Sequence, residues 1–276
     1  MVNIGQTNQL QVVKQLDFGC YLDGGEQGEI LLPRRYVPED TQIGDTIEVF
    51  IYFDSEDRII ATTEQPKLKL GEVAKLKAVS VTSAGAFLDW GLTKDIFVPF
   101  KEQKQRMEVG KWYIVALYID HETNRLAASA KIEKFIDNTP PNYQVGQEVD
   151  LLIYSKTDLG YSAIINSEHW GVLYSNEVFQ ELRVGQSIKG YVKKIRDDEK
   201  IDLILQKPGY EKVDEISQSI LERLKQSDGY LSLTDKSEPE TIYFYLGISK
   251  KVFKKVIGSL YKARLISIDD DGIRLA

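Results

Sequence analysis

The chain has few of the residues on which metal centres and many catalytic centres are built. Its 276 residues include one cysteine and two histidines, which is too few for a Cys/His cluster at metal-ligand spacing. The glycines at Gly24, Gly25 and Gly28 do not precede a helical pattern, so no phosphate-binding loop is indicated. We therefore expect a protein without enzymatic activity, metal or cofactor.

The single cysteine and the lack of long apolar runs also bear on the compartment. Cys20 cannot form an intramolecular disulfide, which fits a reducing environment, and its strand context predicts a buried thiol. No run approaches the roughly 18 apolar residues of a membrane helix. The N-terminal segment has neither the basic start nor the apolar core of a secretory signal. We expect a cytoplasmic protein with no membrane partner.

Acidic residues outnumber basic ones in the chain, and the balance between them differs from segment to segment. The net charge of −7 argues at first against a nucleic-acid partner. Residues 1–66, however, hold 4 basic and 12 acidic residues, whereas residues 67–138 hold 12 basic and 9 acidic ones. The excess acidity therefore lies in the first segment. It either serves solubility or marks that segment for protein contact or self-regulation rather than for contact with phosphate.

Three glycines recur three times with steps of 14 and then 25 residues. The sets are Gly5, Gly19 and Gly44; Gly71, Gly85 and Gly110; and Gly146, Gly160 and Gly185. A fixed internal spacing of this kind indicates one small unit used three times. We call these units the first, second and third repeats.

Each repeat contains five short apolar runs separated by turn residues. Alternation is clearest at residues 46–53: one face carries Ile47, Val49, Ile51 and Phe53, and the other carries Glu48, Phe50 and Tyr52. Strands this short, in a unit without disulfide or metal, favour a closed barrel that leaves no free edges.

The motifs of the repeats resemble the S-one domain, a five-stranded OB-fold RNA-binding module. The first repeat carries the resemblance at residues 17–22 (DFGCYL), 43–45 (IGD) and 57–59 (DRI). The second carries it at residues 85–88 (GAFL), 109–111 (VGK) and 124–126 (NRL). The third matches least well, because Ser162 stands where Tyr21 and Phe87 stand in the others.

The last 68 residues follow a different pattern. Apolar residues recur at helical spacing from Val213 to Leu224, and a second helix is expected at 241–246. Ser249 is a candidate N-cap for a third helix over 250–261, and residues 263–275 resemble a hairpin. Three helices followed by a hairpin resemble a winged helix.

The whole chain therefore reads as a multidomain, mainly β protein. We expect three tandem five-stranded OB-fold barrels at 1–66, 67–138 and 139–208, then an α/β winged-helix domain at 209–276. This order resembles the conserved virulence factor B family of bacteria. The resemblance implies a cytoplasmic RNA-binding regulator without known enzymatic activity.

OB barrels bind single strands by stacking bases on aromatic rings beside a positively charged groove. Carried over from the S-one domain, the aromatic candidates are Tyr21, Phe87, Phe97 and Tyr174, and Tyr161 is a substitute for the aromatic missing at Ser162. Phe18 also fits, although a core position is the stronger expectation for it. Nearby basic candidates are Lys75, Lys77 and Arg125.

The expected third helix of the winged helix and its flank add a second basic cluster. Its members are Lys250, Lys251, Lys254, Lys255, Lys262 and Arg264. A basic helix at this position suggests contact with phosphates, and a solvated lysine face is the alternative.

These observations predict a regulator that binds single-stranded RNA through the repeats and the winged helix. The sequence does not separate RNA from DNA strongly, because contact with the 2′-hydroxyl leaves no readable motif. The alternative is an adaptor that docks on a ribosome or RNA polymerase through its acidic first repeat. The sequence indicates neither the target RNA nor an oligomeric state.

Overall fold

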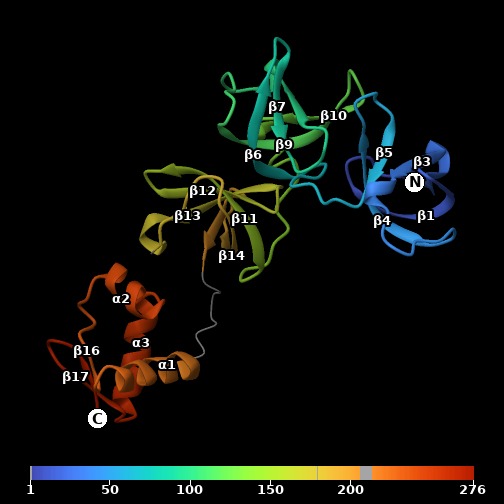
Figure 1. Cartoon of the computed structure of the whole chain (residues 1–276). Helices are drawn as coiled ribbons and strands as arrows, with labels where there is room; N and C mark the ends of the chain where they lie inside the picture. The colour runs from blue at the N-terminus through green and yellow to red at the C-terminus, as the bar shows by residue number, and fades with distance from the viewer. Residues whose placement is uncertain (1, 179, 206–212) are drawn as a thin grey trace. The chain divides into compact units, whose positions relative to one another are not determined.

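The computed structural model describes residues 2–178, 180–205 and 213–276 (Figure 1). The expected junction at Pro208-Gly209 lies outside the described residues. Contacts within the chain divide it into two compact units. They are Met1–Pro140 with Ile164–His169, and Pro141–Ala163 with Trp170–Ala276.

The first repeat is a closed five-stranded barrel with strand order β1-β2-β3-β5-β4. Its strands are β1 (Thr7–Leu16), β2 (Gly19–Asp23), β3 (Glu29–Pro33), β4 (Thr46–Phe53) and β5 (Ile59–Thr62). The parallel pairing of Leu31 in β3 with Ile60 in β5 closes it. Cys20 is buried in its core, as expected.

The second repeat has the same strand succession, and its hydrogen-bonded ladders form one five-stranded sheet. The order of the sheet is β10-β9-β6-β7-β8, and its first and last strands, β10 and β8, pack beside each other. Its strands are β6 (Val73–Val81), β7 (Gly85–Asp89), β8 (Ile96–Pro99), β9 (Trp112–Asp120) and β10 (Arg125–Ser129). Among the described strands, β8 and β10 approach each other without a hydrogen-bonded ladder like the one that joins β3 to β5, so the expected barrel is present here without that last ladder.

The third repeat is again a closed barrel, with order β11-β12-β13-β15-β14. Its strands are β11 (Glu148–Thr157), β12 (Gly160–Ile165), β13 (His169–Tyr174), β14 (Ser187–Ile195) and β15 (Ile201–Ile204). A parallel pairing of β13 with β15 closes it, in the manner of β3 and β5.

The C-terminal region contains three helices and a three-stranded sheet of order β16-β18-β17. The elements are α1 (Val213–Gln226), β16 (Tyr230–Leu231), α2 (Pro239–Leu246), α3 (Lys250–Lys262), β17 (Ile266–Ile268) and β18 (Ile273–Leu275). The Ser249 hydroxyl caps α3 by accepting the N–H of Val252 at 3.3 Å, as expected. Strand β16, which extends the hairpin to three strands, was not expected from the sequence.

The glycine spacing has a structural cause at two kinds of position. Gly44 adopts a φ of +98°, in a turn before β4 that other residues enter only with strain. Gly19 lies where a Cβ would come within 2.3 Å of the Leu32 carbonyl oxygen on the neighbouring strand. Each repeat therefore needs glycine at a turn and at a close contact between two strands, and this requirement explains why the glycine spacing recurs.

Strand β4 is buried on both faces. Ile47, Val49 and Ile51 point into the core of the first repeat. Phe50 and Tyr52, on the opposite face, pack with Trp90 of the second repeat, and their ring centroids lie 5.7 and 6.2 Å from its ring. The first two repeats therefore share one hydrophobic cluster.

Polar contacts reinforce the packing between these two repeats. The Tyr36 and Thr93 hydroxyls lie 2.8 Å apart, and the Leu70 N–H donates to the Gly5 carbonyl at 2.9 Å. The Gln6 amide also donates to the Leu70 carbonyl at 2.6 Å. Hydrogen bonds and a shared apolar cluster together fix the first repeat against the second.

Burial of Tyr52 at this interface predicts a loss of stability at alkaline pH. Desolvation, followed by the nearby Tyr36, raises the pKa of Tyr52 to about 12 from the ordinary 10.0. Below pH 10 the phenol is protonated in the folded and unfolded states, so its contribution is complete. Above pH 10 only the unfolded chain ionises readily, and the free energy of unfolding falls by up to about 1.4 kcal/mol per pH unit until pH 12.

Urea unfolding at pH 8 and pH 11 tests this expectation. Tyr52→Phe should lose about 1 kcal/mol less stability between these pH values than the unsubstituted protein. Tyr261→Phe, at a winged-helix tyrosine that is 56% exposed, is the matched control and should behave like the unsubstituted protein. Equal losses for all three proteins would contradict the expectation.

Candidate nucleic-acid interface

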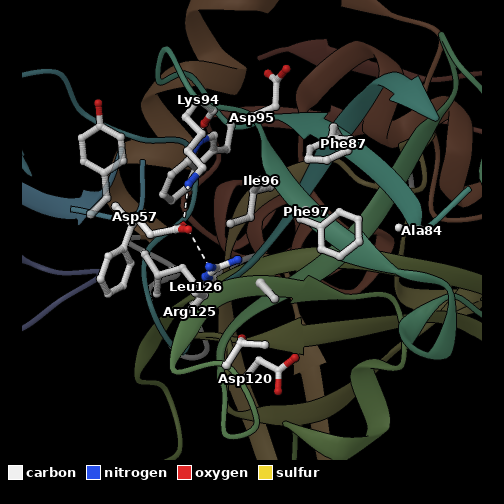
Figure 2. A pocket seen from close by; sticks show the side chains of 15 residues that line it. Asp57, Ala84, Phe87, Lys94, Asp95, Ile96, Phe97, Asp120, Arg125 and Leu126 are labelled. Atoms are coloured by element: carbon white, nitrogen blue, oxygen red, sulfur yellow. Dashed lines mark hydrogen bonds and ion pairs between the residues drawn. The ribbon is translucent and has the colours of Figure 1, made fainter. Parts of the chain in front are cut away.

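A pocket of about 330 Å³ opens in the first compact unit, where the second repeat meets β4 and the following turn of the first repeat (Figure 2). Strands β8 and β10, the unjoined ends of the second sheet, both contribute to its lining. Most of its lining residues are apolar or aromatic, and five charged residues contribute to it as well. This combination suits a planar ligand with charged substituents.

Two of the expected residues, Phe87 and Phe97, form an aromatic pair in this pocket. They are cross-strand partners on β7 and β8, with ring centroids 5.0 Å apart and planes inclined at 41°. Their neighbours Ala86, Leu88 and Val98 are fully buried, so alternation turns both phenylalanines to the outer surface. Both residues are half-buried, so part of each side chain remains open to solvent.

The pocket also brings together two cations and an acidic residue. Arg125, expected from the sequence, pairs with Asp57 of the first repeat at 2.5 Å. Lys94, which sequence reasoning missed, lies 3.6 Å from the same carboxylate and donates to the Asp54 carbonyl at 2.5 Å. Figure 2 shows both cations directed toward Asp57. Its position could have indicated this role, because Lys94 lies two residues before β8, the strand that carries Phe97.

The other basic candidates of the second repeat, Lys75 and Lys77, do not line this pocket. Both belong to β6, where Lys77 is exposed and pairs in register with Asp89. The structure therefore brings Arg125 to the aromatic pair and leaves the two lysines on another part of the sheet.

In the first repeat, Tyr21 occupies the position equivalent to Phe87. It pairs in register with Leu31, and the Lys14 ammonium lies 5.5 Å from its ring centroid. Phe18 packs edge-on against Tyr21, with ring centroids 6.3 Å apart, and is 57% exposed. The expectation of a core position for Phe18 was wrong, because Phe18 lies just before β2, outside the inward alternation of that strand.

In the third repeat the two tyrosines differ in accessibility. Tyr161 is only 9% exposed, so its ring offers little surface for stacking. Tyr161 lies at the position of the buried Cys20 and Ala86 and therefore points into the barrel. Ser162 lies at the position of Tyr21 and Phe87, on the outer face. Tyr174 is half-buried, and its hydroxyl donates to the Asp202 carboxylate at 3.3 Å.

The winged helix presents its basic residues as expected. Its buried side is formed by Val252, Phe253, Val256, Ile257 and Leu260 of α3. The expected lysines and arginine lie away from that side: Lys250 is half-buried, and Lys251, Lys254, Lys255, Lys262 and Arg264 are exposed. Lys254 lies 3.4 Å from the Asp235 carboxylate.

The winged helix also carries exposed aromatics on α2, and sequence reasoning missed them. Phe244 is 81% exposed and Tyr245 is 50% exposed, at the C-terminal end of α2. Both residues follow the buried Ile242 by two and three positions. This spacing could have indicated that their side chains point away from the face of α2 that packs on the core.

The histidines do not form a site in the described part of the chain. A ring nitrogen of His169 lies 2.7 Å from the Thr139 carbonyl oxygen, and this side chain is buried. Among the described residues, no three His, Cys, Asp or Glu side chains lie close enough to hold a metal ion. The helices described here also include none with the length and apolarity of a membrane span.

Comparison with known proteins gives two domain families. The S1 domain model, which describes the S-one domain, matches residues 4–64 and 70–131. A CvfB-like winged helix domain model matches residues 218–275. OB-type S1 domains and winged helices are both nucleic-acid-binding types of domain.

Several relatives match along nearly the whole chain. The protein named conserved virulence factor B from Staphylococcus aureus is 26% identical and covers 99% of this chain and 94% of its own. That from Staphylococcus epidermidis is 27% identical over the same shares. The uncharacterized protein YitL of Bacillus subtilis is 28% identical, over 94% of this chain and 89% of its own.

Among solved structures, a multidomain protein with nucleic acid binding domains from Streptococcus pneumoniae matches with 23% identity and a TM-score of 0.42. The match covers 99% of this chain and 98% of that one. The chain is therefore built from S1 domains and a CvfB-like winged helix domain, and it is similar along nearly its whole length to proteins named conserved virulence factor B.

Proposed function

We propose that this protein binds single-stranded RNA and regulates gene expression during or after transcription, without catalysing a reaction. The observation that carries the proposal is the Phe87–Phe97 pair beside Lys94 and Arg125 in one pocket. A base stacked on these rings would place its phosphate within reach of the two cations.

Other parts of the chain support the same partner. Tyr21 and Tyr174 are accessible at the surfaces of the first and third repeats, and α3 carries a basic face. Several weak sites on one chain raise the effective concentration of each, so modest individual contacts give useful affinity. The S1 domain and winged-helix models that match this chain describe nucleic-acid-binding types of domain, which supports the same partner.

Fluorescence anisotropy tests the proposal with a labelled single-stranded RNA of about 20 nucleotides, the length range of several S1-sized sites. DNA of the same sequence and a duplex RNA serve as comparison ligands. We expect saturable binding to the single strands that weakens steeply as salt rises, because cations on the protein displace counterions. Absence of binding at low salt would exclude the proposal and favour the adaptor with an acidic first repeat.

The winged helix should contribute mainly through its charge. Replacing Lys250, Lys251, Lys254 and Lys255 by glutamine should weaken RNA binding by about tenfold or more at 0.1 M salt and lower the salt slope by about 2. The measurement is the anisotropy titration repeated at several salt concentrations.

A charge-matched control separates location from net charge. Lys189, Lys200, Lys225 and Lys236 are exposed lysines outside α3, and replacing all four by glutamine changes the total charge equally. This control should bind RNA nearly as well as the unsubstituted protein. Equal weakening of both variants would show that α3 has no special role.

A further inference from the structure

The cations of the Phe87–Phe97 pocket are already engaged by the first repeat. Among the described lining residues, the cationic side chains are Lys94 and Arg125, and both face the carboxylate of Asp57. Asp57 lies in the turn that joins β4 to β5, far from these residues in sequence. A carboxylate in this position occupies the place that a phosphate would need.

The turn that carries Asp57 is held in one shape. The Asp54 carboxylate accepts the backbone N–H of Glu56 at 2.8 Å and that of Arg58 at 3.0 Å. It also accepts two guanidinium N–H bonds from Arg58, at 2.9 and 2.7 Å. Asp57 itself has a φ of +62°. The carboxylate of Asp57 is therefore presented by an ordered turn and not by a loose loop.

The turn cannot leave the pocket as a rigid element without disturbing the core. It follows β4 directly, and Phe50 and Tyr52 of that strand are buried against Trp90. A second contact, from the Lys94 ammonium to the Asp54 carbonyl, holds the turn at the rim independently of Asp57. Only the side-chain ion pairs can open easily, because they are partly exposed.

The charge of the pocket fits this arrangement. Its lining has three carboxylates, Asp57, Asp95 and Asp120, against the two cations. A phosphate arriving at Arg125 meets a cation whose charge is already balanced and a neighbouring carboxylate that repels it. One acidic side chain of the first repeat, Asp57, is therefore placed where it opposes phosphate binding at the second.

We propose that Asp57 masks the nucleic-acid site of the second repeat, competing with RNA phosphate for Arg125 and Lys94. This inference rests on the proposed function, since it concerns regulation of the same site. On this proposal, the first repeat supplies a carboxylate that competes with RNA. An RNA strand binds the pocket only if its contacts are strong enough to displace Asp57 from the two cations.

The test compares two substitutions in one turn that remove the same charge. Asp57→Asn removes the masking carboxylate, and asparagine tolerates the left-handed backbone at this position. Glu56→Gln removes a carboxylate that pairs with Arg58 at 2.9 Å and does not line the pocket. RNA affinity is measured by anisotropy with the same 20-nucleotide strand at about 0.05 M and 0.3 M salt, where screening differs strongly.

Asp57→Asn should bind the RNA about three- to tenfold more tightly than the unsubstituted protein at low salt, the size expected for one carboxylate near a partly exposed phosphate. The gain should shrink at high salt and disappear when Phe87 and Phe97 are also replaced by alanine. Glu56→Gln should bind like the unsubstituted protein.

Three other outcomes would overturn the masking, and they are distinguishable. If the unsubstituted protein binds RNA and the two variants bind alike, masking is absent although the proposed function stands. If Asp57→Asn binds more weakly, Asp57 positions Arg125 for binding instead of competing for it. If neither the unsubstituted protein nor Asp57→Asn binds RNA, the proposed function fails and masking fails with it.

Discussion

Replacing Trp90 by alanine should destabilise the protein by about 3–5 kcal/mol, the usual cost of truncating a large core aromatic. Trp90 is 2% exposed, and its ring packs against Phe50 and Tyr52 of the first repeat. Its indole N–H also donates to the Lys94 carbonyl at 2.5 Å. The substitution leaves a cavity in the cluster shared by two repeats and removes that hydrogen bond.

Chemical denaturation of Trp90→Ala and Trp112→Ala measures this effect. Trp112 belongs to the same repeat but is 55% exposed, so its truncation should cost about 0.5–1 kcal/mol. Amide hydrogen exchange adds a second readout. Protection of β4 in the first repeat should fall in Trp90→Ala, although the substitution lies in the second. Loss of protection confined to the second repeat would contradict a shared core.

The double variant Phe87→Ala/Phe97→Ala should lose at least about 30-fold in affinity for single-stranded RNA. A stacked base contributes about 1–3 kcal/mol by alanine substitution, and the two rings together offer the pocket's stacking surface. The salt slope should stay nearly the same, because no cation is removed. This distinguishes the variant from the lysine substitutions in α3, which lower the slope.

Trp112→Ala is again the matched control for this loss. It removes an exposed aromatic ring from the same sheet, outside the pocket. We expect the control to bind RNA within about twofold of the unsubstituted protein, as surface substitutions usually do. The thermal stability of the double variant is measured beside it, because the two phenylalanines are half-buried. Equal affinities for the double variant and the control would place the RNA elsewhere.

The repeated elements could be predicted because the backbone constrains their glycines. A turn with positive φ at Gly44 and the close approach of strands at Gly19 both exclude larger residues. These constraints recur at the same spacing, so the sequence indicated each repeat and its strands. The helical periodicity and the cap at Ser249 likewise indicated the winged helix.

The packing between the first two repeats was not predicted, although its signal was present. Alternation in β4 showed two apolar faces, one of them carrying Phe50 and Tyr52. A free barrel needs only one apolar face on each strand, so the second face indicated a further partner. Periodicity identifies a buried face but not the surface that covers it.

The composition of the site was also only partly predictable. Alternation along the strands places Phe87 and Phe97 on the outer surface and Tyr161 inside the barrel. Proposing Tyr161 in place of the aromatic missing at Ser162 overlooked that these two neighbours point to opposite faces of their strand. Lys94 and Asp57 meet through contacts between repeats, which local sequence does not encode. Lys75 and Lys77 contribute to the positive charge of the second repeat, but they do not line its pocket.

The most direct test of the central proposal is to map where RNA lies on the protein. A 20-mer carrying 4-thiouridine is crosslinked to the full chain by ultraviolet light, and the crosslinked peptides are identified by mass spectrometry; the strand is long enough to span several sites. We expect crosslinks in the segments that contain Phe87 and Phe97, and stronger ones in Asp57→Asn. Crosslinks that avoid these segments, with RNA bound at saturation, would contradict the proposed site.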